Sequence, residues 1–140
     1  MTVLIDTNVI LDVLLKRNPF YLDSAEVLRL SEKGSIKGYL TSNSIADIAY
    51  ILRKNVGKER TKDIISDLMG ITDIVSVTKG DIKKSLNLAK VNDIEDGIQV
   101  VCAKKIKADY IITRDEEGFK YSNISAITPG EFLSKIKNIL

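Results

Sequence analysis

The sequence predicts an α/β fold, specifically a three-layer α/β/α sandwich around a mostly parallel central sheet. Short β-branched runs alternate with segments of helical apolar periodicity along the whole chain. Alternating strands and helices give a parallel sheet that is covered by helices on both faces. The 140 residues contain no linker, repeat or low-complexity segment, so we expect a single domain over residues 1–140.

The first half of the chain is expected to contain two strands and four helices. Pro19 ends the first helical pattern, Ser24 is expected to cap the second helix, and Gly34 follows that helix. Gly70 is expected to end the fourth helix. In order, the expected elements are strand 2–5, helix 9–15, helix 25–32, strand 36–41, a helix opened by Ser44, and helix 58–69.

The second half is expected to contain three strands and three helices. Thr128 as N-cap, Pro129 at the first helical position and Glu131 two residues later form a strong start signal for the last helix. In order, the expected elements are strand 73–78, helix 81–89, helix 94–107, strand 109–113, strand 123–127, and a helix that starts within residues 128–132.

The composition excludes several kinds of chemistry. The chain has no histidine, which removes every mechanism with a histidine acid or base. With one cysteine and no histidine it also lacks the usual zinc ligands. A hydrolase of this composition must use carboxylates and cations that prefer oxygen ligands, while the net charge of +2 by itself indicates no partner.

The single cysteine, Cys102, lies in an apolar helical stretch and is expected to be a buried structural thiol. One thiol cannot form an internal disulfide, which favours a reducing, cytoplasmic location. We find no apolar run long enough to span a membrane and no signal peptide at "MTVLIDTN", so no membrane association is expected.

Four carboxylates are expected at the carboxyl edge of the sheet, where ligands of such folds bind. Asp6 directly follows strand 2–5, and Asp115 follows strand 109–113 with only Arg114 between. Asp96 and Asp47 lie near the starts of helices beside these strands. Like charges at about 4 Å repel by about 4 kcal/mol at an effective dielectric near 20. One or two Mg²⁺ or Mn²⁺ ions would relieve that repulsion.

The acids in the stretch "VNDIEDGIQVV" (91–101) also have a structural explanation. Asp93 can cap the helix with Asp96 reaching back to it, and Ser44 and Asp47 have the same spacing. Acids in a first turn favour the helix dipole as well. Asp6 is harder to explain in this way, because a carboxylate between two apolar segments needs a partner. Asp12 is expected on a solvated helix face.

Two motifs resemble the PIN-domain nucleases. "LIDTNVILDVLLKRNPF" is similar to the opening of that family, and "DIEDGIQVVCAKKIKADYIITRDEEGF" is similar to its later block. The resemblance runs from residue 2 through "ITPGEFL" and is strongest to small prokaryotic single-domain members, which include the VapC-type toxins of toxin–antitoxin pairs. It implies a PIN-like fold, a Mg²⁺- or Mn²⁺-dependent endoribonuclease, an RNA substrate, a cognate antitoxin and a homodimer.

The resemblance also assigns roles to individual residues. Asp6, Asp96 and Asp115 match metal-binding acids, and Thr113 matches a hydroxyl near the metal. Asp47 stands where the family usually has a glutamate, so its shorter side chain is expected to reach the metal only through water. Gly118 departs from the family pattern, because an acid common there is missing while one is gained at position 115. Glu116 or Glu117 are candidates to compensate, and Gly97 is expected to leave room beside Asp96.

The expected substrate is a polyanion, so basic residues near the acids are candidate phosphate contacts. The chief candidates are Arg53, Lys54 and Arg114, with Lys58, Arg60, Lys104, Lys105 and Lys107 in the same two segments. Solvated helix faces are the alternative explanation for these lysines and arginines. The tyrosines at positions 39, 50 and 110 have core spacing, so no aromatic platform for stacked bases is predicted.

Other α/β families match less well. A haloacid-dehalogenase-like enzyme needs an aspartate where this chain has Asn8, and a phosphoreceiver domain needs an acidic pair where it has "TVLI". No glycine-rich loop follows any expected strand, so nucleotide binding has no support. Two rival hypotheses stay open. One is a PIN-like module with a weakened site that binds RNA or a protein, favoured by Asp47 and Gly118, and the other is some other phosphoester hydrolase.

Overall fold

The computed structural model describes residues 1–88 and 93–139 of the chain. Within them the secondary structure follows the expected alternation of strands and helices. In chain order the elements are β1 (Thr2–Ile5), α1 (Thr7–Leu14), α2 (Tyr21–Glu32), β2 (Lys37–Thr41), α3 (Ser42–Val56), α4 (Lys58–Ile71), β3 (Asp73–Val75), α5 (Lys79–Leu86), α6 (Ile94–Lys105), β4 (Tyr110–Ile112), the 3-10 helix η1 (Glu116–Phe119), β5 (Ser125–Ile127) and α7 (Pro129–Ile136).

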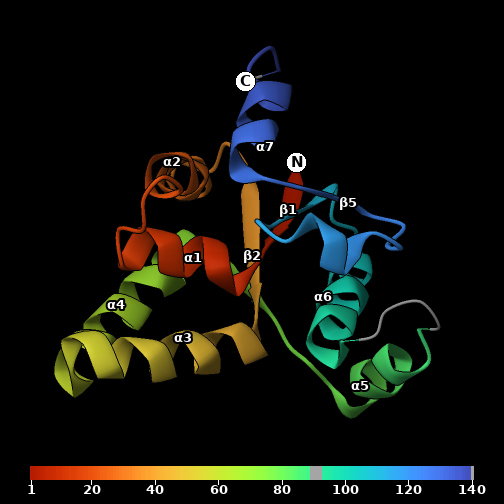
Figure 1. Cartoon of the computed structure of the whole chain (residues 1–140), viewed down its shortest axis with the longest axis horizontal. Helices are drawn as coiled ribbons and strands as arrows, with labels where there is room; N and C mark the ends of the chain where they lie inside the picture. The colour runs from red at the N-terminus through yellow and green to blue at the C-terminus, as the bar shows by residue number, and fades with distance from the viewer. Residues whose placement is uncertain (89–92, 140) are drawn as a thin grey trace.

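The strands form a five-stranded sheet in the part of the chain that the structure describes. Their order is β3-β2-β1-β4-β5, and each neighbouring pair is parallel. Figure 1 shows α1 to α4 on one side of the sheet and α5 and α6 on the other. The predicted α/β class and three-layer arrangement are therefore confirmed.

Each face of the sheet has its own apolar core. Alternate residues of a strand point to opposite faces. Accordingly, the fully buried Val3 and Ile5 pack with α1 to α4 and α7, whereas Leu4 packs with α6 and β4. Cys102 of α6 belongs to the second core with no exposed surface, and burial raises the pKa of its thiol to about 11. The prediction of a buried structural cysteine is confirmed.

The sheet has a switch point between its central strand β1 and the neighbouring β4. From β1 the chain moves outward to β2 and β3, then crosses through α5 and α6 to β4 on the other side of β1. The connections that leave β1 and β4 therefore depart in opposite directions and open a crevice at the carboxyl ends of these strands. Asp6 follows β1, and Thr113 to Asp115 follow β4, so both segments lie at this crevice.

Several helix boundaries differ from those predicted. The second helix begins at Tyr21, so Ser24 lies buried inside α2 instead of capping it. The third helix begins at Ser42 with Thr41 as its cap, and Thr41 Oγ1 accepts the Ser44 backbone N–H at 3.0 Å. Gly70 lies within α4 instead of ending it. Local residue preferences locate helix ends only to within a few residues, because tertiary packing sets the final turns.

Other boundaries differ in the second half of the chain. The third strand is shorter than expected and ends at Val75. Thr78, the predicted end of the strand, instead caps α5 in a capping box with Asp81. The predicted end of that helix, Ala89, lies outside the described residues, as do positions 91 and 92 of the acidic stretch. The start signal of the last helix is confirmed, since Thr128 Oγ1 accepts the Glu131 backbone N–H at 3.2 Å.

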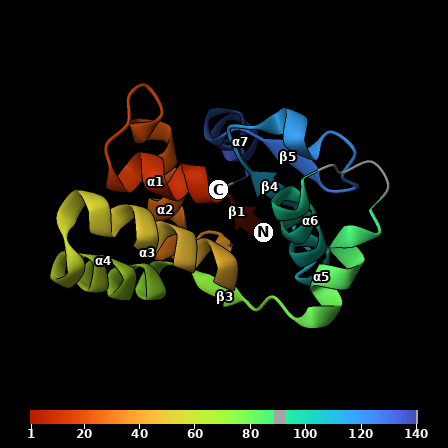
Figure 2. The same cartoon turned by 60° about the horizontal axis from the view of Figure 1, so that its bottom comes forward.

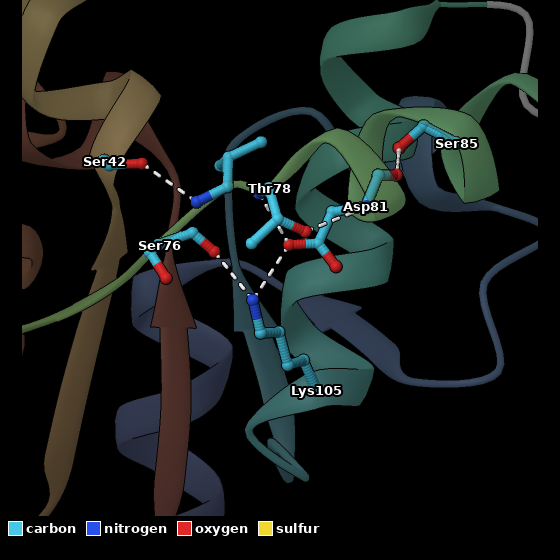
Figure 3. A network of polar contacts seen from close by, with 7 residues as sticks. Ser42, Ser76, Thr78, Asp81, Ser85 and Lys105 are labelled. Carbon is cyan, nitrogen blue, oxygen red and sulfur yellow. Dashed lines mark hydrogen bonds and ion pairs between the residues drawn. The ribbon is translucent and has the colours of Figure 1, made fainter.

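A polar network holds α5 against α6 (Figure 3). Lys105, in the last turn of α6, donates to the Asp81 carboxylate at 2.8 Å and to the Ser76 carbonyl oxygen at 2.9 Å. The same carboxylate accepts the Thr78 backbone N–H at 2.9 Å. Lys105 is therefore engaged in holding two helices together and not positioned as the phosphate contact that its sequence neighbourhood favoured.

No helix in residues 1–88 or 93–139 combines the length and the apolar character needed to cross a membrane.

Candidate functional site

A cleft of about 660 Å³ lies at the carboxyl end of the sheet. Side chains from α1, α3, the start of α6 and the loop after β4 line it. In Figure 2 this end of the molecule comes forward, and α1, α3 and α6 are grouped around β1. All four predicted site carboxylates, Asp6, Asp47, Asp96 and Asp115, are among the lining residues.

Asp6 and Asp115 are held by the same threonine. Thr113, which has no exposed surface, donates its hydroxyl to Asp6 Oδ2 at 2.7 Å. The Asp115 backbone N–H donates to the same Thr113 oxygen at 3.0 Å. Burial raises the pKa of Asp6, the hydrogen bonds from Thr113 and the Thr7 backbone lower it, and the charge of Asp115 raises it again. The threonine therefore links the carboxyl ends of β1 and β4.

Asp96 completes a group of three acids that act on one another. Its pKa is raised to about 6, first by burial and then by the charges of Asp93, Asp115, Asp6 and Glu95. As predicted, Asp93 caps α6, accepting the Glu95 backbone N–H at 2.8 Å, and Glu95 is exposed. The cap and the cleft thus share one helix turn.

Gly118 lies next to the carboxylates of Asp96 and Asp115. A Cβ atom built on Gly118 would lie 2.5 Å from Asp96 Oδ2 and 2.9 Å from Asp115 Oδ2. The backbone N–H of Gly118 also donates to Asp115 Oδ1 at 3.3 Å. The absence of a side chain at position 118 therefore gives two acids access to the same space.

Asp47 lies on the cleft but apart from the other three acids. It is the sixth residue of α3, one turn further along than the predicted first-turn position, and its side chain is exposed. The charges that raise the pKa of Asp6 and Asp96 do not include Asp47. The structure therefore brings Asp6, Asp96 and Asp115 together, whereas Asp47 faces them from α3.

The prediction for Asp12 is wrong, and Arg114, a candidate phosphate contact, forms an ion pair with it. Asp12 has no exposed surface and is not on a solvated face. Arg114 donates to it from Nε at 2.6 Å and from a terminal nitrogen at 3.1 Å, and Arg17 lies 3.7 Å away. The Arg114 guanidinium also lies 4.0 Å from the centre of the Phe20 ring. As placed, Arg114 is the partly exposed ion-pair partner of a buried aspartate.

The predicted roles of two other positions also change. A Cβ on Gly97 would meet Ser85 of α5, at 3.3 Å from Cβ and 3.4 Å from the carbonyl oxygen, so Gly97 permits close packing of two helices instead of leaving room for a cation. Neither Glu116 nor Glu117 lines the cleft, so the structure does not bring either of them to the place of the acid missing at position 118. Burial and then Glu131 raise the pKa of Glu116.

Three basic and aromatic positions lie along α3. Arg53 and Lys54 are exposed, and the Lys54 ammonium lies 4.3 Å from the centre of the Tyr50 ring. Tyr50 is 63% exposed and lines the cleft, so the prediction that it belongs to the core is wrong. Lys54 and Tyr50 therefore form a cation–π pair, and its ring lines the same cleft as the acids.

The sequence-based prediction missed the uncharged polar residues of the cleft. Thr7 donates its hydroxyl to Ser44 Oγ at 2.8 Å, and Thr41 donates to the same oxygen at 3.0 Å. Gln99 of α6 lies one turn after Asp96, and its buried Oε1 has no hydrogen-bond partner. The signal for Gln99 was a single polar residue within an apolar helix, and that signal does not by itself distinguish a site from a surface.

The cleft offers only oxygen ligands from carboxylates, hydroxyls and amides to a bound group. Among residues 1–88 and 93–139, no group of three acidic or cysteine side chains is arranged closely enough to hold an ion. The donor chemistry nevertheless fits a hard cation such as Mg²⁺ or Mn²⁺. Gly118 leaves space beside Asp96 and Asp115, and Gln99 lines the same cleft as these two acids.

Comparison with protein families gives one match that covers most of the chain. The family model described as "PIN domain" matches residues 2–117. The chain is also 26% identical over 137 residues to Ribonuclease VapC1 of Aquifex aeolicus (strain VF5), covering 95% of this chain and 94% of the relative.

Solved structures share the fold at lower sequence identity. One is FitAB bound to an IR36 DNA fragment, with a TM-score of 0.67, 23% identity, and coverage of 91% of this chain and 94% of that one. Another is a toxin–antitoxin complex from Klebsiella pneumoniae, with a TM-score of 0.68, 18% identity, and coverage of 91% and 97%. At these identities the likeness supports the fold alone.

Proposed function

The chain belongs to the PIN-domain family, and on that premise we propose that it is a divalent-metal-dependent endoribonuclease. The observation that carries the proposal is the convergence of Asp6, Asp96 and Asp115 from three separate elements on one cleft. Burial is the first cause of the raised pKa values of Asp6 and Asp96, and the charges of neighbouring acids add to it; a bound cation would offset both costs. The sequence identity of 26% to a protein named Ribonuclease VapC1 supports RNA as the substrate.

The proposed ligands are Asp6, Asp96 and Asp115, and the cation would be Mg²⁺ or Mn²⁺. When bound, such an ion would lower the pKa of a water molecule that it holds and so favour a hydroxide nucleophile without histidine. Thr113 orients Asp6 by its hydrogen bond and keeps the Asp115 backbone next to it. Asp47, on the opposite wall, is proposed to act through water because its side chain is exposed and apart from the other three acids.

The strand of RNA is proposed to pass along α3. Lys54 and Arg53 are exposed there and can neutralise phosphates, while Tyr50 provides an exposed ring that lines the cleft. Arg114 is not included among the proposed phosphate contacts, because its guanidinium is held by Asp12.

We further propose that the protein is the toxin of a toxin–antitoxin pair and binds a cognate antitoxin. The support is that the relative in the Klebsiella pneumoniae structure is in a toxin–antitoxin complex, and that the VapBC2 structure from Rickettsia felis shares this fold at a TM-score of 0.66 and 16% identity. The same proposal includes that the protein forms a homodimer and acts in the cytoplasm.

The first test compares RNA cleavage by wild type and Asp6→Asn with added Mn²⁺ or Mg²⁺. Removing one charge from the three converging acids is expected to reduce cleavage of a panel of RNAs by more than about 100-fold. Asp67→Asn is the matched control, because Asp67 is an exposed acid on α4 outside the cleft. Circular dichroism should show that both variants keep the fold.

A second candidate function is a non-catalytic module that binds RNA or a protein. The observation that favours it is the separation of Asp47 from the other three acids. Equal cleavage by wild type and Asp6→Asn, or no cleavage by either with any metal, would reject the enzyme and favour the module. Cleavage that depends on both metal and Asp6 would reject the module.

A further inference from the structure

Gln99 carries an unexplained feature within the cleft. The side chain is 8% exposed, and its Oε1 is buried without any hydrogen-bond partner in the described part of the chain. It lies on α6 one turn after Asp96, and both residues line the same cleft. Every neighbour from Gly97 to Ala103 is also buried, and Gln99 is the polar one among six otherwise apolar or small residues.

An unpaired buried amide oxygen is unfavourable, since it loses its hydrogen bonds to water and gains none in return. An apolar side chain of similar size would remove that cost at a position so well packed. A buried amide oxygen of a residue that lines a cleft is instead satisfied when a bound group reaches it with a hydrogen-bond donor.

No side chain of the described residues donates to Gln99 Oε1, although several residues that carry donors also line the cleft. The hydroxyls of Thr7 and Thr41 are both directed to Ser44 Oγ, and the Thr113 hydroxyl is directed to Asp6. Asp6, Asp96 and Asp115, when ionised, accept hydrogen bonds and donate none. A ligand bound in the cleft can bring the donor that is absent.

We propose that Gln99 Oε1 accepts a hydrogen bond from an O–H group brought into the cleft by its ligand, a role that rests on the proposed ribonuclease function. Two sources supply this chemistry: a water molecule held by the cation, or the 2′-hydroxyl of an RNA strand. Gln99 is then a positioning residue for the cation's hydration shell in the first case and an RNA-selecting residue in the second.

Gln99→Met tests the proposal because methionine has similar length and shape but no acceptor of comparable strength. Ser24→Ala is a matched control: Ser24 Oγ is the other buried side-chain atom without a partner in the described residues, and it lies in α2 away from the cleft. Both variants are expected to melt at or above the temperature of the wild-type protein without metal, because each removes an unsatisfied buried polar atom.

Two binding measurements distinguish the sources. Calorimetric titration with Mn²⁺, without RNA, reports on the water source. The second compares single-stranded RNA and DNA of one sequence, bound to proteins that also carry Asp6→Asn to prevent cleavage, and reports on the 2′-hydroxyl. Gln99→Met is expected to weaken one of these by about three- to tenfold, either Mn²⁺ affinity or the preference for RNA over DNA, whereas Ser24→Ala changes neither.

The outcomes separate this inference from the function on which it rests. Unchanged Mn²⁺ affinity together with an unchanged RNA preference in Gln99→Met overturns the role of Gln99 alone. A markedly lower melting temperature of metal-free Gln99→Met also overturns it, because the side chain would then be paired within the fold. A wild-type protein that binds neither Mn²⁺ nor RNA rejects the ribonuclease proposal and this inference with it.

Discussion

Gly118 is the residue at which the smallest change is expected to have the most specific effect. Its missing side chain leaves the space in which Asp96 Oδ2 and Asp115 Oδ2 lie, at 2.5 Å and 2.9 Å from a Cβ built there. The atoms that a methyl group would displace are the ends of flexible side chains, and the Gly118 backbone lies outside the left-handed region. A substitution therefore acts on the carboxylates more than on the fold.

We expect Gly118→Ala to weaken Mn²⁺ binding by about tenfold, a typical effect of disturbing the groups that orient metal ligands, while the melting temperature without metal changes little. Calorimetry and thermal unfolding measure the two quantities. Gly70→Ala is the control, because no atom outside its own helix lies within 4 Å of that position in α4. Unchanged Mn²⁺ affinity in Gly118→Ala would show that the carboxylates do not need this space.

At the scale of elements, the packing of α5 on α6 determines where Asp96 lies. Ser85 meets α6 at Gly97, directly after Asp96, and the Lys105–Asp81 ion pair joins the other end of α6 to the start of α5. Asp81 is 5% exposed, so its carboxylate depends on Lys105 and the Thr78 backbone for partners.

Lys105→Met should lower the free energy of unfolding at pH 7 by about 1–3 kcal/mol, because it leaves a buried carboxylate without its cation. The Lys105 hydrogen bond, followed by that of Thr78, lowers the pKa of Asp81 from 3.8 to about 2. A carboxyl whose pKa is lower in the folded state contributes stability above its ordinary pKa and loses it as the pH falls.

The difference between wild type and Lys105→Met should therefore be complete above about pH 4 and shrink as the pH falls toward 2. Urea unfolding over this pH range measures it. Lys83→Met, at an exposed position of α5, is the control and should change the stability little at either pH. A difference that does not depend on pH would indicate lost packing and not a lost ion pair.

For the whole molecule, repulsion among the acids at the carboxyl end of the sheet lowers the free energy of unfolding of the metal-free protein. Asp6, Asp96 and Asp115 come from β1, α6 and the segment after β4, so bringing them together is part of folding itself. A ligand that binds only the folded chain stabilises it in proportion to the logarithm of its concentration.

Mn²⁺ at about 100 times its dissociation constant should add about 2.7 kcal/mol and raise the melting temperature by about 5–10 °C. Differential scanning fluorimetry with and without Mn²⁺ measures the shift. Asp115→Asn should lose most of it, and Asp67→Asn should keep it. A melting curve of the wild type that does not respond to divalent metal would favour the non-catalytic module.

Sequence alone determined the order of the elements, the three layers and the placing of Asp6, Asp96 and Asp115 at one edge. The elements follow from periodicity, which is a local property of the chain, and the shared edge follows from the general rule that the carboxyl ends of parallel strands meet at one side of a sheet. The PIN family also became visible from two short motifs.

Only the tertiary structure decided which polar groups have partners. The Asp12–Arg114 pair joins residues 102 positions apart, and neither the pairing nor the burial of Asp12 can be derived from either neighbourhood. The same holds for the packing role of Gly97, the space above Gly118 and the unpaired oxygen of Gln99. Contacts of this kind depend on how helices pack across the sheet, and a helical periodicity fixes which face is buried but not what that face meets.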